Sequence, residues 1–179
     1  LETGTKVKEH LNMHQVSHDF CRTRGKGIMA QRRWSGVSIR RAGADDLSTI
    51  MAVEIACFDE KRYSRDMVLF ILTDEEFATF LAEDGRAVGA ASVHVKGNGA
   101  HLVSIGVVPE RRCRGVAREL MGAAEAEAIS RGASRMTLQV SVLNVAAMNM
   151  YLQRGYRTTY LLKDYYGGGK DAYLMEKAL

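Results

Sequence analysis

The sequence lacks any apolar run that approaches the roughly 18 residues needed to span a membrane as a helix. It also does not open with a basic segment followed by an apolar one, the pattern of a secretory signal peptide. Cysteine is scarce: Cys21, Cys57 and Cys113 are odd in number and share no spacing typical of disulfides or of a metal site. These absences favour a cytoplasmic protein that does not bind membranes and keeps its thiols reduced.

Most of the chain also lacks an excess of charge of either sign. The sequence has 25 Lys and Arg against 21 Asp and Glu, a net charge of +4. Residues 1–36 hold seven of the basic and three of the acidic residues, which leaves 18 of each in 37–179. This neutral region argues against nucleic acid as the main partner, because phosphate binding usually requires a strongly basic face.

Length and hydropathy fit one domain. A chain of 179 residues that is 46% hydrophobic buries one sizeable core and leaves no room for a second catalytic domain. We therefore predict one domain over residues 37–179. Residues 1–36 form a basic N-terminal extension that we expect to be disordered or to dock as a short helix. Residues 1–5 are compatible with an origin in the expression vector.

Apolar periods and turn signals predict the element order strand, two helices, three strands, helix, strand, helix and two strands. The expected strands include 37–41, 77–81, 87–95, 101–108 and 136–142. The first helix follows Asp45 or Asp46, and the second follows Ser64. Side chains expected to turn inward from the first helix are Leu47, Ile50, Met51 and Ile55.

The segment after the strand at 101–108 has the character of an anion site. Pro109, the only proline, ends that strand because it has no N–H for the ladder. A helix follows, with apolar residues every four positions: Val116, Leu120, Ala124 and Ala128. Gly115 lets the backbone approach a ligand, and the first-turn N–H groups have no partners within the helix. Together with the helix dipole and the arginines at 112, 114 and 118, they favour a pyrophosphate.

This segment resembles motif A of the Gcn5-related N-acetyltransferases (GNAT), Q/R-x-x-G-x-G/A, which reads here as Arg112, Cys113, Arg114, Gly115, Val116 and Ala117. Alone, the pattern also fits a plain helix N-terminus with solvated arginines. The family's motif B, N-x-x-A-x-x-x-Y-x-x-x-G-[FY], follows as Asn144, Ala147, Tyr151, Gly155 and Tyr156. Two motifs in order, separated by one helix and one strand, are far more specific than either alone.

A narrower resemblance is to the protein N-alpha-acetyltransferases, including the ribosomal-protein alanine acetyltransferases. It rests on the Tyr165-Tyr166 pair, the short loop after it and an acidic-Ala strand at Asp171-Ala172. The resemblance covers residues 37–179. It implies an α/β GNAT fold, with a mixed, largely antiparallel sheet of about seven strands splayed in the middle and about four flanking helices.

The resemblance implies that a protein α-amine attacks the thioester carbonyl of acetyl-CoA, giving an amide and free CoA. By the same carry-over, the pantetheine arm lies along Ile105, Gly106 and Val107, with the oxyanion near a backbone N–H of Gly106 or Val107. The residues expected to hold the rest of the cofactor are Arg112, Cys113, Arg114, Gly115, Val116, Ala117, Arg118, Asn144 and Tyr151. Asn144 is also a plain helix cap, and the two roles are compatible.

Tyr151 falls where the family keeps a tyrosine beside the thioester sulfur, as proton donor to the departing thiolate. The alternative is a core aromatic. Gln139 stands where many relatives have a glutamate or histidine base, and it cannot accept a proton at neutral pH, although it can orient a water. Deprotonation at pH 7 costs about 1 kcal/mol for an α-amine and about 4.6 kcal/mol for a lysine, so a site without a strong base should favour protein N-termini.

Other candidate bases are His101 and, in the loop after the first helix, Glu60 or Asp59. His101 could instead point away from the site, and Glu60 could simply be solvated. The resemblance implies that Phe58 packs against the first substrate side chain while Tyr165 and Tyr166 hydrogen-bond the peptide backbone. Edge-strand packing is the alternative for the two tyrosines.

Several readings stay open from sequence alone. His10, His14 and His18 lie at helical spacing with Cys21 after them, but no carboxylate or second ligand set supports a metal, so none is predicted. The rival functions are a small-amine or lysine acetyltransferase and an acyl-CoA-binding regulatory module without a base. Contact between the basic extension and ribosomal RNA is a further possibility. The sequence does not predict the oligomeric state.

Overall fold

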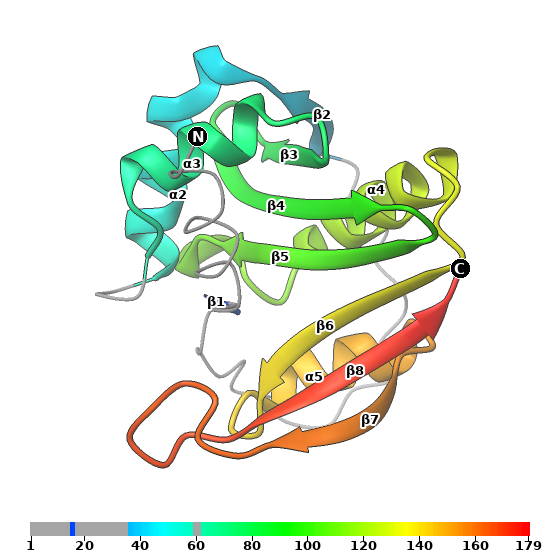
Figure 1. Ribbon diagram of the computed structural model, residues 1–179. Coiled ribbons are helices and arrows are strands. Elements are labelled where there is room, and N and C mark those ends of the chain that lie inside the picture. Colours follow the sequence, from blue (N-terminus) through cyan, green and yellow to red (C-terminus); the bar gives the residue numbers. More distant parts are fainter. Residues whose placement is uncertain (1–14, 17–35, 59–61) are drawn as a thin grey trace.

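The computed structural model describes residues 15–16, 36–58 and 62–179. Asp59, Glu60 and the histidines at 10, 14 and 18 lie outside the described residues, as does all of the N-terminal extension except residues 15–16 and 36. Figure 1 shows a twisted sheet whose two halves run together at one end and diverge at the other, with helices on both faces.

One eight-stranded sheet organises the molecule. Its path runs β2-β3-β4-β5-β6-β8-β7, and β1 (Gln15–Val16) pairs with β5 beside that path. Neighbouring strands are antiparallel except for the parallel pairs β5–β6 and β1–β5. The strand bounds are β2 Ser38–Ala42, β3 Phe77–Glu83, β4 Ala87–Lys96, β5 Gly99–Val107, β6 Arg135–Ser141, β7 Arg157–Leu162 and β8 Ala172–Ala178.

Helices cover the sheet unequally. On one face α2 (Leu47–Cys57) and α3 (Arg65–Thr73) enclose a core with β3, β4 and β5. On the other face α4 (Val116–Ser130) and α5 (Val145–Gln153) bury the larger core. In Figure 1, α5 lies behind β6 and β8, and no described helix covers the front of that half-sheet. The predicted fold, with seven main strands and four flanking helices, is confirmed.

Side-chain caps begin two of these helices where the sequence predicts them. Ser64 Oγ accepts a hydrogen bond from Met67 N at 3.2 Å, and Asn144 Oδ1 accepts one from Ala147 N at 3.1 Å. Such caps satisfy first-turn N–H groups that have no helical partner. They therefore set where α3 and α5 start.

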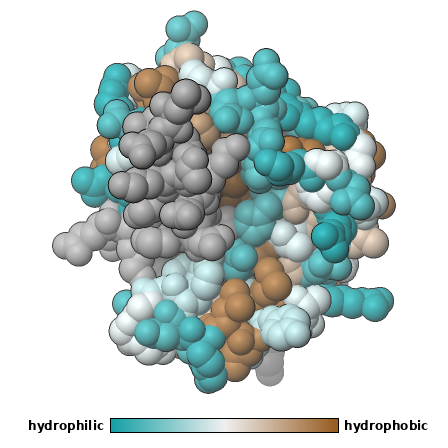
Figure 2. Space-filling model, in the orientation of Figure 1, coloured by the Kyte–Doolittle hydropathy of each residue, from teal (hydrophilic) through white to brown (hydrophobic). Residues whose placement is uncertain are grey.

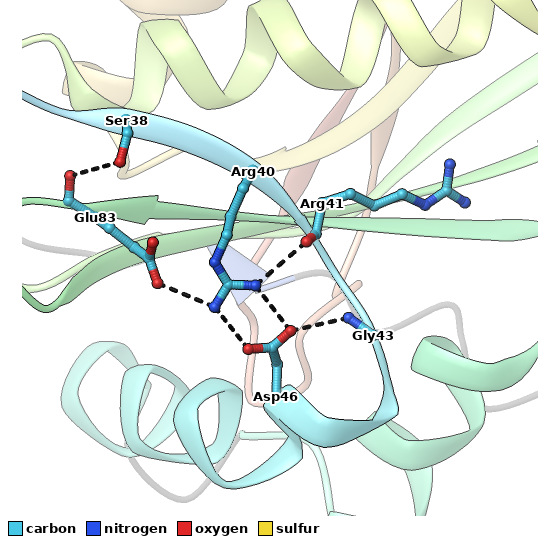
Figure 3. Close-up of polar contacts among 6 residues, drawn as sticks. All are labelled: Ser38, Arg40, Arg41, Gly43, Asp46 and Glu83. Atoms are coloured by element: carbon cyan, nitrogen blue, oxygen red, sulfur yellow. Dashed lines mark hydrogen bonds and ion pairs between the residues drawn. The ribbon is translucent and has the colours of Figure 1, made fainter.

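The start of α2 is held by a surface ion cluster (Figure 3). Arg40 of β2 donates to both carboxylate oxygens of Asp46, at 2.7 and 2.9 Å, and to Glu83 Oε1 at 3.0 Å. Asp46 also accepts from Gly43 N at 3.0 Å. The guanidinium of Arg40 and this N–H hold the pKa of Asp46 at about 2. The cluster fixes the turn by which β2 enters α2.

One expectation about α2 is wrong. Ile55, predicted to face inward, is 60% exposed, whereas Glu54 is only 5% exposed. Glu54 follows Leu47 by seven positions, almost two full turns at 3.6 residues per turn, so both lie on the inner face. Ile55 is rotated about 100° further around the helix. The buried face of α2 therefore includes a carboxyl group.

The two halves of the sheet separate where β5 leaves β6. These strands pair only at Gly99–Arg135, Ala100–Met136 and His101–Thr137. A bulge lies just beyond: Val93 pairs with Leu102 and Ser92 with Ser104, so Val103 has no partner on β4. Bulges bend a strand and increase its twist. The predicted splay is thus present.

The strand β1 lies in this splay. It pairs in parallel with Ser104 and Ile105 of β5 and contacts β6 as well. The sequence did not predict a strand there, since the extension lacks an apolar period. Figure 2 shows the same face, on which apolar side chains gather over the β6–β8–β7 half.

Candidate active site

The loop before α4 forms the turn that motif A predicts. Gly115 has φ = 85° and Cys113 has φ = 60°, both in the left-handed region. A Cβ on Gly115 would meet nothing within 4 Å, so glycine is needed there for its backbone conformation rather than for space. The Gly115 carbonyl accepts from Arg118 N at 2.9 Å and from Glu119 N at 3.2 Å. No side chain in the described ranges caps this helix, which leaves its first N–H groups pointing out of the turn.

The arginines of this loop do not all point the same way. Arg112 Nε donates to the carbonyl of Val107 at 2.9 Å, so this side chain folds back on the end of β5. Arg118 donates to Gln153 Oε1 at 3.0 Å and links α4 to α5. Arg114 is exposed. The arginines therefore place positive charge around the turn. Arg112 also occupies the Val107 carbonyl, which an extended ligand could otherwise use as a hydrogen-bond acceptor.

One of the two described cysteines differs from its expected state. Cys113 is disulfide-bonded, which contradicts the expectation that its thiol is unpaired. Cys57 is a free thiol at the end of α2, and burial raises its pKa to about 12, against the opposing effect of Arg112 nearby. Cys57 is therefore protonated and unreactive at neutral pH.

Tyr151 on α5 is fully buried, and its hydroxyl has no hydrogen-bond partner among the described residues. Its ring packs edge-on to Tyr156, with centroids 5.8 Å apart. Burial raises the pKa of Tyr151, with a smaller effect from Tyr166. A buried hydroxyl without a partner is unfavourable unless a ligand supplies one. The Tyr151 hydroxyl is therefore a protonated donor that the fold leaves unused.

Behind β5 lies a second polar group, which the sequence analysis did not identify. Glu54 Oε1 accepts from Ser104 Oγ at 3.3 Å, and Glu54 Oε2 accepts from Tyr63 N at 3.4 Å. The Tyr63 hydroxyl donates to the Val103 carbonyl at 3.3 Å. Desolvation raises the pKa of Glu54 to about 7, against the lowering effect of the hydrogen bonds from Tyr63 N and Ser104 Oγ. The available signal was a glutamate on the apolar stripe of α2, two turns after Leu47.

The Tyr165-Tyr166 pair lies in an ordered loop between β7 and β8. The two rings pack edge-on with centroids 5.0 Å apart. Gly167, Gly168 and Gly169 all have positive φ, and Gly169 N donates to Asp164 Oδ1 at 2.6 Å. This loop is therefore a folded turn.

The loop tyrosines act on Tyr63 and on Tyr151. After burial and the charge of Glu54, Tyr165 and Tyr166 are the remaining causes that raise the pKa of Tyr63. Tyr166 also acts on Tyr151. The fold thus brings together hydroxyl groups from α5, the β7–β8 loop and the segment before α3.

Phe58 and Gly106 pack against each other. Phe58 is 7% exposed, and a Cβ on Gly106 would lie 3.1 Å from its ring and 3.0 Å from Cys57 Sγ. Only glycine lets the end of α2 come this close to β5. Phe58 therefore packs against β5 at Gly106, where the oxyanion is expected from the sequence.

Gln139 and His101 mark the fork between the half-sheets. His101 Nδ1 and Thr137 Oγ1 lie 2.7 Å apart at the last pair before β5 and β6 separate. Gln139 follows on β6; it is half-buried, and its Oε1 has no hydrogen-bond partner in the described part of the chain. His101 thus engages β6 at the fork, and Gln139 presents an unused acceptor.

Two kinds of feature are absent from the described residues. No group of three or more His, Cys, Asp or Glu within 15–16, 36–58 and 62–179 is arranged to hold a metal ion. In the same ranges, no helix has both the length and the apolar character needed to cross a membrane.

Comparison with known proteins places this geometry in a family. The model of the acetyltransferase (GNAT) family matches residues 47–156. The catalytic subunit of the N-terminal acetyltransferase A complex from Arabidopsis thaliana is 35% identical over 152 residues, which cover 80% of this chain and 78% of that protein.

Two solved structures share the fold. The ribosomal-protein-S18-alanine N-acetyltransferase from Escherichia coli has a TM-score of 0.73 at 23% identity, covering 79% of this chain and 93% of that one. The NatC complex bound to Gag peptide and CoA has a TM-score of 0.72 at 18% identity, covering 80% and 99%. With a family model over most of the domain and a relative of this identity, the chain belongs to the GNAT family and is an N-acetyltransferase.

Proposed function

We propose that the protein transfers the acetyl group of acetyl-CoA to the α-amine of protein N-termini. The observation that carries the proposal is the buried hydroxyl of Tyr151, a proton donor without a partner among the described residues. The name of the Arabidopsis relative supports the substrate class, and the CoA in the NatC structure supports the cofactor.

The residues at the splay fit the parts of acetyl-CoA. The turn at Gly115 offers free N–H groups and the positive end of α4 to a pyrophosphate, flanked by Arg114 and Arg118. Beyond its last pair with β6, β5 offers backbone groups of residues 105–107 to the pantetheine arm, which would replace the pairing of β1 with Ile105. Asn144 caps α5. When bound, acetyl-CoA supplies the activated carbonyl for the transfer.

Three groups of this chain carry the chemistry. The N–H of Gly106 or Val107 stabilises the oxyanion that forms at the acetyl carbonyl. The Tyr151 hydroxyl protonates the departing sulfur, since the pKa that burial raises keeps it protonated. Gln139 orients a water with its unused oxygen, because an amide accepts no proton at neutral pH.

The peptide enters beside the tyrosine loop. Tyr165 and Tyr166 bind its backbone, and Phe58 forms the wall near its first side chain. An α-amine has a pKa about 2.6 units below that of a lysine, so a site without a strong exposed base selects N-termini.

Peptide pairs test the proposal. One peptide of each pair has a free N-terminus and no lysine, and the other has a blocked N-terminus and one lysine. We expect acetylation of the first, measured by CoA release and by mass spectrometry of the product. Turnover of blocked lysine peptides would instead identify a lysine or small-amine acetyltransferase. CoA binding without turnover would identify a regulatory module.

The location and partners of the protein are also proposals. We infer a cytoplasmic protein whose basic residues 1–36 contact the ribosome, since seven of them are Lys or Arg and three are Asp or Glu. Co-sedimentation with ribosomes should then weaken as salt rises and be lost when residues 1–36 are removed.

A further inference from the structure

The proposed acetyl transfer leaves one proton without an acceptor. The incoming amine must lose a proton, and Gln139 occupies the strand position where a base is expected. Among the described residues, Glu54 is a buried carboxyl group facing the open part of β5, and it forms no ion pair with Lys, Arg or His in those ranges. The inference below rests on the proposed function.

Glu54 reaches the splay through Ser104. Ser104 is 7% exposed, and its hydroxyl donates to Glu54 Oε1 at 3.3 Å. The other oxygen of Glu54 accepts from Tyr63 N at 3.4 Å, which holds the carboxyl group in place. Ser104 lies beyond the last β5–β6 pair, on the part of β5 with which β1 pairs.

The bulge at Val103 sets the direction of the Ser104 side chain. Beyond the bulge, Ser104 contacts Glu54 and Gly106 contacts Cys57, so both face α2. Residues two apart along a strand lie about 6.6 Å from each other. The Ser104 side chain therefore lies on the α2 side of β5, two residues before Gly106, where the oxyanion is expected.

We propose that Ser104 and Glu54 form a relay that removes the proton of the incoming α-amine. The Ser104 hydroxyl passes its proton to Glu54 Oε1 and receives one from the amine, directly or through one water. The C–N bond forms as this proton leaves, Glu54 becomes a neutral carboxylic acid, and it later returns the proton to solvent. Glu54 acts through Ser104 and is therefore a positioning residue.

The acidity of Glu54 suits this role. Burial raises its pKa from the ordinary 4.5 to about 7. The equilibrium constant for proton transfer from an α-amine of pKa about 7.8 to Glu54 is then unfavourable by less than about tenfold. For an ordinary glutamate it would be unfavourable by roughly 10³-fold. About half of the Glu54 side chains are ionised at neutral pH and ready to accept a proton.

Among the described residues, few other titrating groups face Glu54. On its own helix it faces Cys57, and from the segment before α3 it faces Tyr63; its charge raises the pKa of both. Arg112 acts on Cys57 from the loop after β5. From β4 and α3 the same core receives apolar side chains, including Ala90, Val68 and Ile71. Among the described residues packed in this core, Glu54 is therefore the group whose pKa lies near neutrality.

The test is the pH dependence of kcat/KM for the full chain, with acetyl-CoA and one free N-terminal peptide. The variants are Glu54→Gln, Glu54→Asp and Ser104→Ala. We expect E54Q to lower kcat about 10²-fold with little change in KM. It should also reduce the slope of log kcat/KM against pH below neutrality by about one unit, which corresponds to the loss of one titrating proton. E54D should restore part of kcat and the slope. S104A should lower kcat, and the double variant should fall no further than E54Q.

Ser92→Ala is the matched control. Ser92 is a buried serine directly opposite Ser104 on β4, and its hydroxyl lies 2.9 Å from that of Thr79. We expect S92A to keep the wild-type slope. If E54Q does not fold, S104A carries the test, because the carboxyl group remains. An E54Q enzyme with the wild-type slope would overturn the relay while leaving peptide acetylation intact. A wild-type enzyme that acetylates no amine would overturn the proposed function itself.

Discussion

At the scale of single residues, we expect the hydroxyl of Tyr151 to contribute to catalysis and little to stability. Its hydroxyl is buried and contributes no hydrogen bond within the described fold. Replacing it with hydrogen should therefore leave the free energy of unfolding within about 1 kcal/mol of wild type. We expect Tyr151→Phe to lower kcat by 10-fold to 100-fold, roughly the lower range for loss of a general acid.

Tyr156→Phe is the control for this prediction. Tyr156 is also buried, packs edge-on to Tyr151, and has a hydroxyl without a hydrogen-bond partner in the described residues. Kinetics and thermal unfolding of the two variants should agree in stability and differ in kcat. Equal kcat values would remove Tyr151 from the chemistry.

Glu54 predicts how stability depends on pH. Its pKa is about 7 in the folded protein and 4.5 in an exposed glutamate, so folding favours the protonated form. The resulting stabilisation is complete below pH 4.5 and is lost as the pH rises through 7. The difference amounts to about 3 kcal/mol. We expect E54Q, which cannot ionise, to gain stability relative to wild type from pH 5 to pH 8 in urea unfolding. Parallel pH profiles for the two proteins would contradict the raised pKa.

At the scale of elements, α4 offers a glycine at each end for comparison. Gly115 before the helix and Gly132 after it both have φ = 85°, and a Cβ on either would meet nothing within 4 Å. Alanine at either position should destabilise the fold by about 1–2 kcal/mol through backbone strain. We expect only Gly115→Ala to weaken CoA binding, measured by calorimetry, because the pyrophosphate is proposed to bind at that turn. Equal CoA affinity in the two variants would place the cofactor elsewhere.

At the scale of the whole molecule, β1 connects the N-terminal extension to the splay. It pairs with Ser104 and Ile105, and the pantetheine arm is proposed to use the same edge of β5. We expect prolines at both positions 15 and 16, which remove the strand's N–H groups, to lower KM for acetyl-CoA about three- to tenfold. Alanines at both positions keep these groups and serve as the control. An unchanged KM in the proline variant would mean that the pairing does not compete with the cofactor.

The elements whose signals lie close together in sequence could be predicted. The turn before α4, the cap at Asn144 and the element order each depend on residues within one or two turns of one another. Motif spacing also placed Tyr151 on α5, although not the burial of its hydroxyl without a partner. The prediction failed at two adjacent positions of α2. Hydropathy alone predicts that Ile55 is buried, whereas the structure buries Glu54 and exposes Ile55.

The sequence by itself determined the family, the order of the main strands and helices and the glycine turn before α4, because backbone propensity and spacing act over short distances. Only the tertiary structure decided that Glu54 meets Ser104, 50 residues away, and that Arg112 turns back onto β5. It also decided that β1 enters the splay. The contact between Glu54 and Ser104 arises from the packing of α2 on a bulged strand, and desolvation by that packing raises the pKa of Glu54.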